Sequence, residues 1–277
     1  MSGRPNNFLA QALQEAAMAL RMKQFDRAKQ LATDVLKSNR TDRNAALILA
    51  HALIAQNQAG EAVAPLERVA RRNADAEIET LLGAALCGSR RAAEGIEQLR
   101  RTAARRPPYL PAFQELAGQL AKAGQFGEAI RTIEDDLALA PDSIDLKLDL
   151  GRLFLQDNEP AKARAILTVA SDAAPGRPDV LADLAQALLN EREYGAAADA
   201  FRRALALRPE DPFSRANLAT CLLEMGERNG GEAALRSVFR GRPHMLGRMA
   251  YVLAASSHGR FFFRPSAAAR FLEREPG

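Results

Sequence analysis

The sequence predicts an all-α protein, a right-handed α-solenoid in which helix-turn-helix repeats stack on one another. The first observation is composition, because 56 Ala and 37 Leu, two strong helix formers, fill about a third of the 277 residues. The second is a period of 34 residues in the prolines, which recur at Pro141, Pro175, Pro209 and Pro243. The third is the same period in a leucine followed by a small residue, at Leu116-Ala117, Leu150-Gly151, Leu184-Ala185 and Leu218-Ala219. Repeats of this kind bury their apolar faces only by stacking, so they form arrays.

Residues 110–143 show how each element of one repeat follows from its side chains. A first helix is predicted by apolar residues at helical spacing, at Phe113, Leu116, Ala117 and Leu120. Gly124 then ends this helix, because glycine readily takes the left-handed conformation of a helix end. A second helix is predicted by a further apolar stripe, at Phe126, Ala129, Ile130, Ile133 and Leu137. Pro141 cannot continue that helix and opens the turn to the next repeat.

The same markers place seven repeats along the chain. They lie near residues 9–42, 43–75, 76–109, 110–143, 144–177, 178–211 and 212–245. We therefore expect a repeat domain over residues 1–245, followed at 246–277 by a C-terminal capping helix and a tail rich in Phe and Arg.

This pattern resembles the tetratricopeptide repeat family. Its second-helix marker is an Ala followed four residues later by a large apolar residue, at Ala129 and Ile133, Ala163 and Leu167, and Ala197 and Phe201. The resemblance covers almost the whole chain. It implies a fold in which the first helix of each repeat lines an inner, concave surface that binds protein partners.

Polar side chains occupy the positions that the resemblance places on this inner groove. They are Asn44, His51, Gln114, Lys122, Asp149, Arg152, Gln156, Asp183, Gln186, Asn190, Asn217 and Thr220. Such side chains can hydrogen-bond the backbone of an extended peptide. Alternatively, they satisfy one another or the turns between helices. We favour a binding groove, because Asp149 and Asp183 would be costly to bury without partners.

A specialised groove is not expected. Family members that grip the C-terminal carboxylate of chaperones use Lys and Asn on successive first helices. Here the positions of the key Lys hold Leu13, Leu47, Thr80, Gln114, Leu148, Ala182 and Ala216. The resemblance therefore argues against a carboxylate clamp.

The C-terminal segment is distinctive. We expect a helix over 244–257 and another over 267–274 with Ser266 as its N-cap. The candidate tail residues are Phe261, Phe262, Phe263, Arg264, Phe271 and Leu272. They either cap the apolar end of the last repeat or dock into a partner or a second copy of the chain. Capping is favoured, because the open ends of repeat arrays need a cover.

No arrangement of residues indicates catalysis, a metal or a cofactor, so we expect a protein that is not an enzyme. The three histidines, at positions 51, 244 and 258, have no acid or cysteine at motif spacing. Cys87 and Cys221 are expected to be small apolar fillers. The carboxylate pair Asp135-Asp136 lies in a charged second helix and is expected to be solvated.

Charge and cysteine usage bear on partners and location. The net charge is +4, and the residues from Gly226 onward hold nine Arg and four Glu. Solvated helix faces account for such blocks most simply. The excess of 32 Arg over 6 Lys is typical of a GC-rich genome and suggests a bacterial protein. Three features lead us to expect a cytoplasmic protein. The two cysteines lie far apart in the sequence, the N-terminus lacks the basic and then apolar layout of a secretory signal, and no apolar run is long enough for a membrane span.

The predicted function is a protein-interaction scaffold or adaptor that presents a polar concave groove to a peptide or helix of a partner. One alternative is a regulatory module for a separately encoded enzyme, such as a glycosyl- or sulfotransferase, to which the resembled family is often joined. Another is binding to nucleic acid or a membrane surface through the Arg-rich C-terminal end, which would be sensitive to salt. A homo-oligomer formed through the tail is a further alternative.

Overall fold

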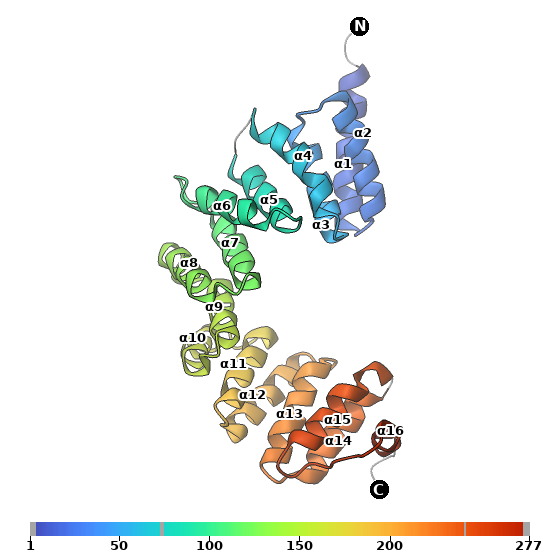
Figure 1. The fold of residues 1–277 in the computed structure, drawn as a ribbon, viewed down its shortest axis with the longest axis vertical. Helices are drawn as coiled ribbons and strands as arrows, with labels where there is room; N and C mark the ends of the chain where they lie inside the picture. Colours follow the sequence, from blue (N-terminus) through green and yellow to red (C-terminus); the bar gives the residue numbers. More distant parts are fainter. Residues whose placement is uncertain (1–3, 73–74, 241, 274–277) are drawn as a thin grey trace. The chain divides into compact units, whose positions relative to one another are not determined.

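A computed structural model describes residues 4–72, 75–240 and 242–273. All regular structure in these residues is helical, which confirms the all-α prediction (Figure 1). The chain divides into two compact units, Met1–Leu139 and Ala140–Gly277. In each unit, consecutive helices form hairpins and each helix packs against the next, as expected for helix-turn-helix repeats.

The first unit contains four hairpins. Its helices are α1 (Arg4–Arg21), α2 (Phe25–Ser38), α3 (Arg43–Ala55), α4 (Ala59–Ala70), α5 (Ala76–Cys87), α6 (Ala92–Ala103), α7 (Leu110–Lys122) and α8 (Phe126–Leu139). The first helices of neighbouring hairpins also contact each other, α1 with α3, α3 with α5 and α5 with α7. The first helices of this unit therefore lie in a row.

The second unit repeats this arrangement and adds a terminal helix pair. Its elements are α9 (Ile144–Gln156), α10 (Pro160–Ala173), α11 (Pro178–Asn190), α12 (Tyr194–Leu207), α13 (Pro212–Glu224), α14 (Arg228–Phe239), the 3-10 turn η1 (Pro243–Met245), α15 (Leu246–Ala255) and α16 (Pro265–Glu273). The first helices again contact one another in order, from α9 through α11 and α13 to α15.

Local chemistry explains where these helices begin and turn. Asp42, Asp75 and Ser143 are N-caps whose side chains accept a hydrogen bond from a backbone N–H in the first turn. In six of the seven hairpins the turn holds one residue in the left-handed conformation, and these residues are Lys23, Asn57, Gly124, Asn158, Arg192 and Gly226. From residue 124 onward they are spaced 34 apart, so the backbone repeats the period of the sequence.

Close approach of paired helices depends on small residues. An added Cβ at Gly151 would lie 2.5 Å from Leu167, a fully buried side chain on the partner helix. Gly95 on α6 meets α5 still more tightly, because its Cβ would lie 2.6 Å from the backbone oxygen of Gly83 and 2.5 Å from Cys87 Sγ. The helices of these hairpins therefore meet at glycine.

The C-terminal helix covers the end of the second unit. Leu272 is buried, and Phe262 and Phe271 pack against the core formed by α13, α14 and α15. The capping prediction is therefore confirmed for the fold. The expected helix over 244–257 is instead the turn η1 followed by α15, and α16 begins at Pro265 rather than after a Ser266 cap. Arg274, the predicted last helical residue, lies outside the described residues.

The prediction that Asp136 is solvated is wrong. This carboxylate is fully buried, and neither oxygen has a hydrogen-bond partner among the described residues. Asp136 lies seven residues after Ala129 and three after Ile133, which places it on the buried stripe of α8. Burial raises the pKa of Asp136 to about 6. Its neighbour Asp135 is exposed, as expected.

We predict that Gly95→Ala lowers the free energy of unfolding by about 1–3 kcal/mol, the usual cost of overpacking. The cause is the clash with backbone atoms of α5, which cannot rotate away. Gly118→Ala is the matched control, because an added Cβ at this exposed position in α7 meets nothing within 4 Å. The control should gain roughly 0.5–1 kcal/mol from helix propensity. Urea unfolding measures both, and a Gly95→Ala variant as stable as the parent would contradict this packing.

We also predict that Asp136→Asn raises the melting temperature at pH 7.5 but not at pH 4. Because the folded-state pKa of Asp136 is raised to about 6, the folded protein binds more protons than the unfolded chain between about pH 4 and 6. The stability of the folded state therefore falls as pH rises through this window. Asn removes a buried unpartnered charge, which costs about 1–3 kcal/mol or more. Asp135→Asn is the control and should leave melting unchanged, whereas equal effects at both pH values would count against the buried charge.

Candidate functional site

The first helices of the second unit carry a connected set of polar side chains. We call it the polar ladder, and its members are Asp149, Arg152, Asp183, Gln186, Asn190, Asn217 and Arg248. They lie on α9, α11, α13 and α15, the row of first helices whose neighbours contact each other (Figure 1). Each neighbouring pair of these helices is joined by at least one ladder bond.

At one end of the ladder, an arginine lies between two carboxylates. Arg152 Nε on α9 donates to Asp183 Oδ2 on α11 at 2.7 Å, and Arg152 Nη1 lies 3.8 Å from Asp149 Oδ1. Burial raises the pKa of both Asp149 and Asp183, although Arg152 acts to lower it. The two carboxylates with one guanidinium leave an excess of acceptors that can receive hydrogen bonds.

Amides continue the ladder toward the C-terminal end. Asn217 Nδ2 on α13 donates to Gln186 Oε1 on α11 at 2.7 Å, and Gln186 Nε2 donates to Asn190 Oδ1 at 2.8 Å. Arg248 Nη2 on α15 donates to Asn217 Oδ1 at 3.0 Å, and its guanidinium carbon lies 5.1 Å from the ring centroid of Phe213. Phe213 is exposed, so the ladder ends beside an accessible aromatic ring.

The structure brings together six of the predicted groove residues, namely Asp149, Arg152, Asp183, Gln186, Asn190 and Asn217. Within the second unit, Gln156 is exposed, and Thr220 donates only to a carbonyl of its own helix. The mutual hydrogen bonds fit the alternative in which these side chains satisfy one another. That alternative does not account for all of their polar groups, because Asn190, the last residue of α11, is exposed.

Sequence reasoning missed Arg248 and Phe213. A signal for Arg248 does exist, because the ladder bonds join residues 31 positions apart: 152 with 183, 186 with 217, and 217 with 248. This step is three residues shorter than the 34-residue repeat. Each residue therefore bonds to one that lies about one helical turn before its own equivalent on the neighbouring first helix. Phe213 lies at the second position of α13 and offered no such signal.

The predicted groove residues of the first unit do not form a ladder. Asn44 and His51 on α3, and Gln114 and Lys122 on α7, are all exposed, and α5 separates the two helices in the row. Between the first helices α3 and α5, Arg43 Nε donates to Asp75 Oδ2 at 2.6 Å, next to the start of α5. Ionic contacts at a helix end thus replace the amide contacts of the second unit.

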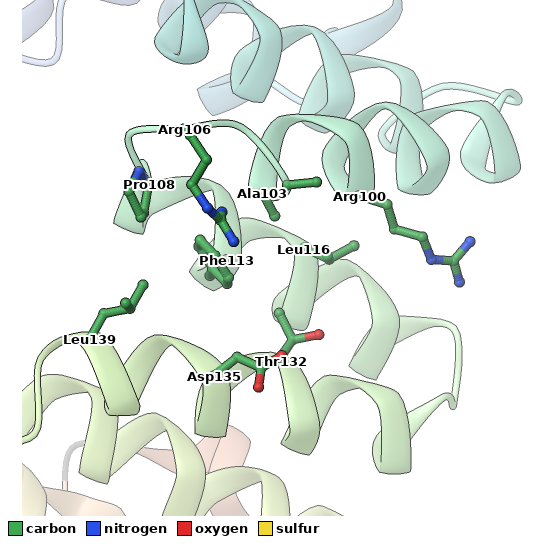
Figure 2. Close-up of a pocket in the computed structure, with 10 residues that line it drawn as sticks. Arg100, Ala103, Arg106, Pro108, Phe113, Leu116, Thr132, Asp135 and Leu139 are labelled. Atoms are coloured by element: carbon green, nitrogen blue, oxygen red, sulfur yellow. The ribbon is translucent and has the colours of Figure 1, made fainter.

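The first unit instead contains a pocket of about 530 Å³ between α6, α7 and α8. Its apolar lining includes Phe113, Leu116 and Leu139. Figure 2 shows Arg106 directed toward Phe113 from the loop above, while Asp135 lies on α8 opposite. The sequence did not reveal this pocket, because its lining combines the loop before α7 with the second helices α6 and α8, and only Phe113 and Leu116 come from a first helix.

The remaining reactive side chains are held in unreactive settings. Burial raises the pKa of the Cys87 thiol to about 11 and that of Cys221 to about 12, so both are protonated at neutral pH. His258 Nδ1 lies 2.9 Å from the Leu223 carbonyl oxygen, which occupies it in a structural contact. Among the described residues, no group of His, Cys, Asp and Glu has the geometry of a metal site. No helix in the described ranges is long and apolar enough to span a membrane.

Solved structures with a similar fold include bacterial and human proteins. PilF of Pseudomonas aeruginosa is 18% identical over 73% of this chain and 92% of its own, with a TM-score of 0.59. PilW, a type IV pilus biogenesis factor, is 22% identical over 78% of this chain and 98% of its own, with a TM-score of 0.63. Human IFIT1, solved as a dimer with m7Gppp-AAAA, is 15% identical over 88% of this chain and 63% of its own, with a TM-score of 0.63. At these identities the likeness is one of fold.

The family follows from sequence comparison. No curated protein sequence matches the chain. The sequence model of the tetratricopeptide repeat, however, matches residues 19–85, 120–187 and 188–254, which together exceed half of the chain. These matches cover the first helices α3, α9, α11 and α13 and the turns at Gly124, Asn158, Arg192 and Gly226. The chain therefore belongs to the tetratricopeptide repeat family.

Proposed function

We propose that this chain is a non-catalytic scaffold or adaptor that presents the polar ladder to a peptide or helix of a partner protein. The observation that carries the proposal is the ladder itself, a row of polar side chains joined across four successive first helices. A row built only to hold helices together would be served as well by apolar contacts, which the core already supplies.

The chemistry of the ladder suits recognition of a peptide backbone. Asn and Gln each offer both a donor and an acceptor, so Gln186 and Asn217 can exchange a bond with each other for bonds to a peptide. Such an exchange conserves the number of hydrogen bonds and costs little free energy. Asp149 and Asp183 add acceptors for the N–H groups or cationic side chains of a ligand. The exposed ring of Phe213 offers an apolar contact at the end of the row.

The identity of the partner decides whether the chain is a general adaptor or the regulatory module of one enzyme. Recovery of many unrelated proteins through the ladder would make the chain a general adaptor. Recovery of one dominant enzyme would make it the regulatory module of that enzyme. The bacterial origin and the cytoplasmic location remain predictions.

We predict that Arg152→Ala combined with Asn190→Ala lowers partner capture about tenfold, because a hydrogen bond to a charged group contributes roughly 1.5–3 kcal/mol. Melting should fall by only a few degrees, since the pair between Arg152 and Asp183 is partly exposed and worth less than about 1 kcal/mol. Affinity purification from the native host with quantitative mass spectrometry measures capture, and circular dichroism measures melting.

The matched control is Arg202→Ala combined with Arg203→Ala. It also removes surface arginines, but from the exposed face of α12, a second helix. Capture by this control should equal that of the parent. If the ladder variant captures partners as well as the parent does, the ladder is not a recognition surface.

A further inference from the structure

The segment between α15 and α16 holds two large apolar side chains in water. We call residues 260–264 the Phe tip. Its backbone is not helical, and its three phenylalanines alternate in direction. Phe262 points inward, with its ring centroid 5.3 Å from that of Phe271 on α16. Phe261 and Phe263 are 69% and 94% exposed, and their rings form an edge-to-face pair at 5.2 Å.

Specific contacts hold the Phe tip in place. Arg260 Nε donates to Oε1 of the buried Glu232 at 2.6 Å, and its guanidinium carbon lies 5.1 Å from the Phe271 ring centroid. The Arg260 backbone N–H donates to the Leu253 carbonyl oxygen at 2.7 Å. Arg228 Nη2 donates to the Gly259 carbonyl oxygen at 3.2 Å. The two exposed rings are therefore displayed by a fixed segment and not by a loose one.

The surroundings of the Phe tip are basic. Glu232 is surrounded by three arginines, Arg228, Arg236 and Arg260, so its charge is more than balanced. Arg264 and Arg270 are exposed and form no ion pair among the described residues. Arg264 follows Phe263 directly in the chain, so a positive charge without an ion-pair partner among the described residues borders the two projecting rings.

We propose that the Phe tip binds the surface of an anionic lipid bilayer. Phe261 and Phe263 enter the boundary between headgroups and acyl chains, and Arg264 and Arg270 contact anionic headgroups. Projecting apolar side chains bordered by basic ones are suited to this interface, which is apolar beneath and negatively charged above. A projection of two rings needs no shaped cavity in its partner, and a bilayer offers none. This binding uses residues outside the polar ladder, so it is independent of the proposed function.

The test uses the full chain and sedimentation with vesicles made of phosphatidylcholine alone or of equal parts phosphatidylcholine and phosphatidylglycerol. The parent should sediment with the anionic vesicles only, and less so as salt rises. Phe261→Ser combined with Phe263→Ser should lower the partition coefficient about tenfold or more. Arg264→Glu combined with Arg270→Glu should reduce it by a similar factor. Tyr251→Ser is the matched control, because Tyr251 is 72% exposed on α15 but outside the Phe tip.

A second measurement reports insertion directly and remains informative if the Ser variants are unstable. The sequence contains no Trp, so a Phe263→Trp variant has a single Trp, whose emission can be excited separately from that of the three Tyr. Its emission should shift to shorter wavelength when the anionic vesicles are added, whereas a Tyr251→Trp variant should show no shift.

Three results would overturn the proposal. The first is failure of the parent to bind anionic vesicles, or equal binding by the double Ser variant. The second is binding of a single-stranded oligothymidylate, lost in the same variants, without binding of vesicles. The third is an emission shift of the Phe263→Trp variant that follows protein concentration without vesicles, because it would mean that the Phe tip docks into a second copy of the chain.

Discussion

Each hairpin depends on the close approach of its two helices and on the apolar stripe that it shares with the next hairpin. Gly151 against Leu167, and Gly83 against Gly95, show how little room separates paired helices. Leu and Ala fill the rest of the interface, and side chains such as Phe201 and Leu253 are almost completely buried. The stripe uses the positions of both helices that face the apolar core. The positions of the first helices that face away from this core are therefore free for polar residues.

The polar ladder is a consequence of this packing. Stacking sets neighbouring first helices side by side, so that a side chain on one meets a side chain 31 positions later on the next. The same step recurs because the helices repeat with one geometry. The first unit shares the packing but not the ladder, since its first helices carry other side chains at these positions, such as Gly118 where Arg152 stands one repeat later. Packing therefore permits a ladder, and the sequence of each repeat decides whether one forms.

Periodicity made most of the fold predictable. A leucine followed by a small residue, and a proline, mark fixed positions in most repeats, and first helices begin at Arg43, Ala76, Leu110, Ile144 and Pro178, as the period indicates. Individual partnerships were harder to predict. Asp136 belongs to a residue type that is usually exposed, but its position in the helical register of α8 is a core position. The structure shows it buried. Arg248 lies after the last full repeat, and the pocket beside Phe113 depends on the path of a loop, which no period encodes.

The central claim is that a shared apolar spine leaves the polar face of the first helices free for recognition. In-cell photo-crosslinking tests it most directly, with a photoreactive amino acid placed at Asn190 on α11 or at Arg203 on α12. The account predicts a discrete crosslinked product from position 190 and none from position 203. Crosslinking from position 203 alone, or none from position 190 when the chain is otherwise bound to its partner, would contradict it.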